Sequence, residues 1–153
     1  MDQYIRSVIE ALGRVEAFRG IPEDGLQNLL VWGHMQVFPS GGVLMRQGEP
    51  GDRLHVVLRG QVRVERESID PTPLVLAILG PGELVGEMGV LDSAPRSATV
   101  TATEETQTLE LGAELLAQTI LLYPEVTMPL LRTLSQRLRN TSDLVEHMAR
   151  SNL

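Results

Sequence analysis

The residues best suited to chemistry lie in one glycine-rich stretch, residues 82–100, which reads GELVGEMGVLDSAPRSATV. Gly86 and Gly89 flank Glu87 closely, and Arg96 follows nine residues after that glutamate. Glycine lets the backbone approach a ligand, and a turn of backbone N–H groups can bind an anion. An arginine fork suits phosphate oxygens, whereas an ionised glutamate only accepts hydrogen bonds and so suits hydroxyl groups. The stretch therefore predicts a site for a sugar phosphate.

A simpler alternative for the same residues is a glycine-rich hairpin in which Glu87 and Arg96 pair with each other at the surface. Their spacing, however, resembles the phosphate-binding cassette of the cyclic nucleotide-binding domain family, written G-E-[LIVM]-[GA]-x(6)-R-[ST]-A-[TS]. The resemblance implies that Glu87 binds the ribose 2′-hydroxyl, and that Arg96 and nearby backbone amides bind the cyclic phosphate. The cassette residues that it places at the ligand are Gly86, Glu87, Met88, Gly89, Arg96, Ser97 and Ala98.

Composition limits the classes of protein that fit. The 153 residues include no Cys, which excludes disulfides and thiolate metal sites, and their formal net charge is −7. An acidic chain lacks the general attraction to phosphates on which nucleic-acid binding depends. No apolar run is long enough to span a bilayer, and the N-terminus lacks the basic start of a signal peptide. We therefore expect a cytoplasmic protein with no membrane partner and no direct nucleic-acid binding.

Helical patterns precede and follow a central region that is rich in strands. Apolar residues at the i, i+3, i+4, i+7 spacing predict an amphipathic helix over residues 2–18, and Pro22 opens a second, shorter helix. The only tryptophan, Trp32, is expected to pack in the core or against a helix. Residues 113–123 form a further predicted helix.

Between residues 34 and 111, short β-rich runs alternate with Gly, Pro, Asp and Ser, as in a sandwich or barrel of antiparallel strands. His55 alternates with apolar neighbours and is expected on the outer face of its strand. The predicted strands are residues 34–38, 43–46, 54–58, 62–67, 74–79, 97–103 and 106–110.

A second pattern in this region, G-x(6)-G-E-P-G-D-x-L-x-V-V-L-x-G-x-V-x-V, also resembles the family. The resemblance implies that its defining residues shape turns and core and do not contact ligand; they are Gly41, Gly48, Gly51, Asp52, Leu54 and Gly60. The expected fold class is α+β, with an antiparallel, jelly-roll-like β-roll between N-terminal helices and a long C-terminal helix. We expect one domain made of N-terminal helices (1–33), the β-roll (34–111) and C-terminal helices (112–153).

The last predicted helix, from about residue 125 to about residue 150, carries an apolar seam spaced by three and four residues. Such a seam is typical of helices that pair, and it predicts a homodimer; the alternative is that the seam packs on the β-roll of its own chain. Pro129 is expected to kink the first turns of this helix. The seam residues are Leu131, Leu134, Leu138, Thr141, Val145 and Met148.

Residues 137–145, RLRNTSDLV, resemble the dimer helix of the bacterial cAMP receptors, the catabolite activator branch of the family. The resemblance implies that Thr141 of one subunit and Ser142 of its partner hydrogen-bond the adenine, which favours cAMP over cGMP as ligand. It also implies a set of apolar base contacts, each of which could equally be plain core. These are Val64, Leu76 and Ala77, with Val85 close by.

The predicted function is regulatory binding of a cyclic mononucleotide, with no catalytic residues, metal or cofactor. The three histidines stand on separate elements, unlike the ligand cluster of a cupin-type oxygenase. The alternative is a β-roll module for protein interaction or dimerisation that binds no ligand; the intact Glu87 and Arg96 argue against it. The family's bacterial receptors continue into a helix-turn-helix domain, for which this sequence leaves no room. We therefore expect a stand-alone sensor or the sensing half of a longer protein, with an unidentified effector.

Overall fold

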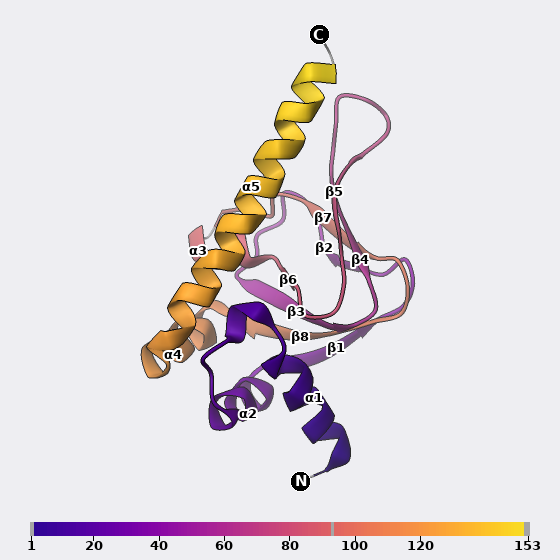
Figure 1. The fold of residues 1–153 in the computed structure, drawn as a ribbon. Coiled ribbons are helices and arrows are strands. Elements are labelled where there is room, and N and C mark those ends of the chain that lie inside the picture. Colours follow the sequence, from indigo (N-terminus) through magenta and orange to yellow (C-terminus); the bar gives the residue numbers. More distant parts are fainter. Residues whose placement is uncertain (1, 93, 152–153) are drawn as a thin grey trace.

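The computed structural model describes residues 2–92 and 94–151, but not the side chains of residues 88, 91–92 and 140–151. Two four-stranded antiparallel sheets pack face to face (Figure 1). The first has the order β1 (His34–Phe38), β8 (Thr106–Gly112), β3 (Arg53–Arg59), β6 (Leu84–Val85). The second has the order β2 (Val43–Met45), β7 (Thr99–Ala102), β4 (Val62–Arg66), β5 (Leu74–Leu79). The predicted α+β class with an antiparallel β-roll is confirmed.

The helices gather at one end of the roll, and α5 runs from there along its side (Figure 1). The N-terminal helix ends earlier than predicted, because α1 stops at Gly13 and a separate 3₁₀ turn follows. Among the described residues, no helix has both the length and the apolar character that a membrane span requires. The helical elements are α1 (Gln3–Gly13), η1 (Glu16–Phe18), α2 (Glu23–Trp32), α3 (Glu87–Asp92), α4 (Ala113–Leu122), η2 (Pro124–Val126) and α5 (Thr127–Ser151).

Two apolar cores lie on opposite faces of the first sheet. Leu54 and Val56 of β3 join a core shared with the helices, whereas Val57 of the same strand joins a core between the two sheets. Adjacent residues of a strand point to opposite faces, so β3 is covered on both sides. This strand is therefore a rigid support for whatever the neighbouring loops hold.

Two expectations about single residues were wrong. His55 is buried, because both faces of β3 are covered and the alternation rule assumes that one face meets water. Trp32 is 68% exposed, because it is the last residue of α2 and its side chain lies outside the helix-side core.

The long helix α5 also differs from expectation at its start. Pro129 is the third residue of α5, within the first turn, where a backbone N–H has no partner inside the helix and proline is tolerated. Leu134 packs against the helix-side core, whereas Leu131 and Leu138 are 52% and 64% exposed. The rest of the predicted seam, Thr141, Val145 and Met148, lies outside the described side chains.

Candidate functional site

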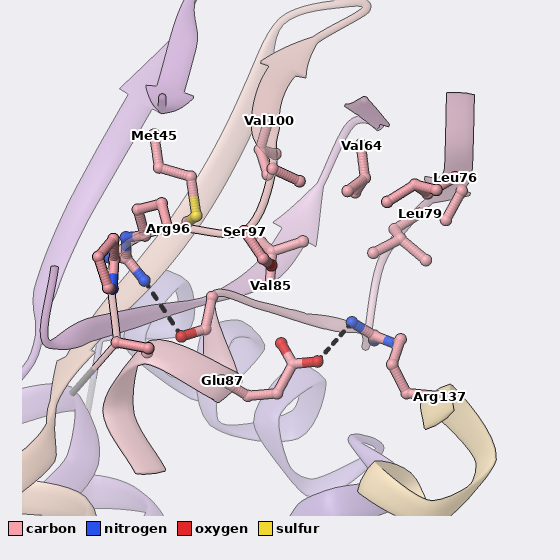
Figure 2. Close-up of a pocket in the computed structure, with 16 residues that line it drawn as sticks. Met45, Val64, Leu76, Leu79, Val85, Glu87, Arg96, Ser97, Val100 and Arg137 are labelled. Atoms are coloured by element: carbon pink, nitrogen blue, oxygen red, sulfur yellow. Dashed lines mark hydrogen bonds and ion pairs between the residues drawn. The ribbon is translucent and has the colours of Figure 1, made fainter. Parts of the chain in front are cut away.

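A cavity of about 330 Å³ lies between the inner face of the second sheet, the segment after β6, and α5 (Figure 2). Every predicted site residue whose side chain is described lines it or contributes its backbone to it. These are Val64, Leu76, Ala77, Val85, Gly86, Glu87, Gly89, Arg96, Ser97 and Ala98. The side chains of Met88, Thr141 and Ser142 lie outside the described residues.

The segment after β6 folds so that a glutamate enters the cavity from a helix. β6 has only two residues, Gly86 follows with a φ of 85°, and α3 begins at Glu87. This positive φ favours glycine, and a Cβ at Gly86 would lie 2.8 Å from Nη1 of Arg96. The sequence predicted a glycine turn here but neither the short strand nor the helix, because both are too brief to show a periodic pattern.

Arg96 supplies the positive charge of the cavity. Its Nη1 donates to the carbonyl of Gly86 at 3.1 Å and its Nη2 to the carbonyl of Arg53 at 2.6 Å. These bonds use two of the five guanidinium N–H groups, and the structure shows no acceptor for the other three among the described residues. Burial lowers the pKa of Arg96, while Asp52, Glu110 and Glu87 oppose this effect. Because arginine stays protonated in proteins, the group is charged and able to bind an anion.

Glu87 is buried and does not pair with Arg96 as the simple hairpin would require. Its Oε1 accepts a hydrogen bond from Nη1 of Arg137 at 2.8 Å (Figure 2). Arg137 comes from α5, fifty residues along the chain, and it also lines the cavity. The sequence pattern alone did not predict a role for Arg137. A signal was available, because Arg137 lies four residues before Thr141 and so on the same face of the helix.

The rest of the wall is apolar and faces the charged groups across the cavity. Side chains from β2, β4, β5, β6 and β7 form it (Figure 2). They include three lining residues that the sequence did not single out: Met45, Leu79 and Val100. A cavity of this size and mixed lining fits a small ligand with an anionic end, a hydroxyl group and a flat apolar part.

Comparison with known proteins identifies the family. The family model for the cyclic nucleotide-binding domain matches residues 35–122, more than half of the chain. This chain belongs to the cyclic nucleotide-binding domain family. A CRP-like cAMP-activated global transcriptional regulator of Mycobacterium tuberculosis is 32% identical over 134 residues, which cover 88% of this domain and 60% of the relative.

Solved structures of related proteins support the same family assignment. The N-terminal domain of a transcriptional regulator from Streptomyces coelicolor A3(2) is 37% identical to this cyclic nucleotide-binding domain, with a TM-score of 0.69 over 88% of this chain and 93% of that one. The catabolite activator protein of Thermus thermophilus is 33% identical, with a TM-score of 0.77 over 88% and 63% of the two chains. The present chain spans 52–60% of the length of curated relatives that it matches.

Near Arg96, a partly buried polar cluster joins three strands of this cyclic nucleotide-binding domain. Glu110 accepts hydrogen bonds from Arg53 at 3.0 Å and from Gln36 at 2.8 Å, and its Oε2 lies 3.5 Å from Nε2 of His55. His55 also shares a 2.8 Å hydrogen bond with the Thr108 hydroxyl. Burial lowers the pKa of His55 to about 4, which Glu110 opposes, so the ring is neutral near pH 7.

Proposed function

We propose that this domain binds a cyclic mononucleotide reversibly, most readily cAMP, and acts as a non-catalytic sensor. The observation that carries the proposal is the placement of charged Arg96 and buried Glu87 in one cavity with an apolar wall. The guanidinium N–H groups that have no acceptor among the described residues suit the cyclic phosphate. A carboxylate that only accepts hydrogen bonds suits the ribose 2′-hydroxyl.

Arg137 gives the sensor a means of reporting occupancy. Glu87 accepts from Arg137 through Oε1, and its Oε2 has no donor among the described residues, which leaves an acceptor for the ribose hydroxyl. A ligand that contacts Glu87 therefore also affects the ion pair that joins Glu87 to α5. If α5 has two positions, the ligand shifts the equilibrium between them only by the difference between its affinities for the two.

The base would lie against the apolar wall of Val64, Leu76 and Ala77, with Val85 close by. From the resemblance to the bacterial cAMP receptors, we propose that Thr141, with Ser142 of the partner subunit, accepts from the adenine amino group, which is the basis for preferring cAMP over cGMP. The relative from Mycobacterium tuberculosis, named as cAMP-activated, supports this choice.

Titration calorimetry with cAMP and cGMP tests the proposal. Arg96→Gln removes a charge-assisted contact to phosphate and is expected to weaken cAMP binding by about 2–5 kcal/mol. Arg59→Gln, an exposed position outside the cavity, is the matched control and should bind as the wild type does. Equal cAMP affinity of the wild type and Arg96→Gln would contradict the proposed phosphate site. Tighter binding of cGMP than of cAMP would contradict the proposed preference for adenine.

A further inference from the structure

The loop between β2 and β3 holds Arg96 from behind, although its sequence pattern predicts only a role in shaping turns and core. The backbone N–H of Arg96 donates to the carbonyl of Glu49 at 2.8 Å, and the backbone N–H of Gly48 donates to the carbonyl of Arg96 at 2.8 Å. The guanidinium then reaches the carbonyl of Arg53 just beyond the loop. Arg96 is thus tied at its backbone and at its tip to one segment, residues 48–53.

Gly51 lies at the middle of this segment, directly against the arginine side chain. A Cβ on Gly51 would lie 2.2 Å from Nε, 2.5 Å from Cζ and 2.6 Å from Nη2 of Arg96. These distances are far below van der Waals contact, so no side chain fits while Arg96 keeps its place. Gly51 is not among the glycines with positive φ, so its backbone angles do not by themselves call for glycine.

Gly89 closes the other side of the guanidinium. A Cβ there would lie 2.9 Å from the carbonyl of Gly51 and 3.1 Å from Nη1 of Arg96. The arginine side chain therefore lies in a narrow space between Gly51 of the β2–β3 loop and Gly89 of α3. The direction of its remaining N–H groups depends on both.

We infer that Gly51 is a positioning residue for nucleotide binding, which sets the direction of the Arg96 guanidinium without touching the ligand. The inference rests on the proposed function and adds a determinant of affinity outside the cavity lining. A methyl group at Gly51 displaces the guanidinium from the carbonyls of Gly86 and Arg53. The displaced group is the mobile end of a flexible side chain, so the fold accommodates the change while the phosphate loses an aligned partner.

The experiment compares Gly51→Ala with a control glycine in two backgrounds. In the wild-type background, Gly51→Ala is expected to bind cAMP about tenfold more weakly, as for one misaligned charge-assisted contact. Gly112→Ala is the control, because a Cβ there meets no atom within 4 Å, and it should leave affinity unchanged. The melting temperatures of both variants should stay close to that of the wild type.

The second background is Arg96→Ala, which removes the side-chain atoms that a Cβ on Gly51 would meet. Here Gly51→Ala should cause no further loss of cAMP affinity. An equal loss in both backgrounds, or wild-type affinity of Gly51→Ala alone, overturns the positioning role. Failure of the wild type itself to bind cAMP would instead count against the proposed function, so the two failures are distinguishable.

Discussion

Two buried ionisable side chains of this domain, Glu87 and His55, lie in different electrostatic environments. Glu87 faces a cavity and has a cation beside it, Arg137, at 2.8 Å. His55 lies within the roll next to Glu110 and Thr108, and burial depresses its pKa to about 4. The first arrangement joins a cavity-lining carboxyl group to α5, and the second keeps a buried ring neutral near pH 7.

The buried His55 predicts a pH dependence of stability. Its pKa falls from the usual 6.5 to about 4 on folding, so the unfolded chain binds the proton more readily between these values. Stability is therefore complete above about pH 6.5 and declines as the pH falls toward 4, by about 2 kcal/mol between pH 7.5 and pH 5. Urea unfolding at these two pH values measures the change.

His55→Gln provides the comparison, because glutamine can still hydrogen-bond Thr108 but does not titrate. The variant should be less sensitive to pH over this interval than the wild type. The same pH sensitivity in both proteins would mean that other groups cause it.

At the scale of elements, α3 and α5 are the described helices that contribute charged side chains to the cavity wall, through Glu87 and Arg137. Arg137 of α5 reaches Glu87, while Arg139 bonds Ser135 and Gln136 of the same helix and no other described residue. One arginine thus ties the helix to the site, and the other does not.

This contrast predicts how α5 responds when each arginine is changed. Arg137→Gln removes the cationic partner of Glu87, so the middle of α5 should open more often and exchange its amide hydrogens faster in the ligand-free protein. Arg139→Gln, with the same change of charge, should exchange like the wild type. Hydrogen exchange over residues 130–139 measures both, and equal rates in the two variants would show that α5 is held by other contacts.

Elements with a local pattern could be predicted from sequence, and those that depend on distant contacts could not. The strands at 34–38 and 74–79 have the predicted bounds, because each is a short β-rich run between glycine and proline residues. The spacing of Glu87 and Arg96 likewise predicted residues that share the cavity. Arg137 was missed, because its contact joins residues fifty apart. His55 was misplaced, because its burial depends on what covers the second face of β3.

At the scale of the whole molecule, the exposed leucines of α5 suggest a second copy of the chain. Leu131 and Leu138 are seven residues apart, the spacing of equivalent positions in a pair of helices, and both are more than half exposed. Leu134, which lies between them in the sequence, packs against the core of its own chain and is therefore only partly available to a second helix. We therefore expect a homodimer in which helix pairing alone is weak.

Leu131→Asp combined with Leu138→Asp should make the protein monomeric, because two charges would then meet in an apolar contact. Gln118→Asp combined with Gln136→Asp adds the same charge away from the seam and should leave the oligomeric state unchanged. Sedimentation velocity at several concentrations, with and without cAMP, distinguishes the two. A wild-type protein that sediments as a monomer at every concentration, with and without cAMP, would contradict the predicted homodimer.

The position of Trp32 decides which optical signals this protein can give. The sole tryptophan is 68% exposed at the end of α2 and does not line the cavity. Its indole is already in contact with water, so filling the cavity with ligand should barely change its fluorescence. A flat fluorescence titration would therefore say nothing about ligand affinity. A chromophore must be brought to the site, either on a fluorescent nucleotide analogue or as an indole in the wall through Leu76→Trp. The native indole then serves as an internal reference in the same cuvette.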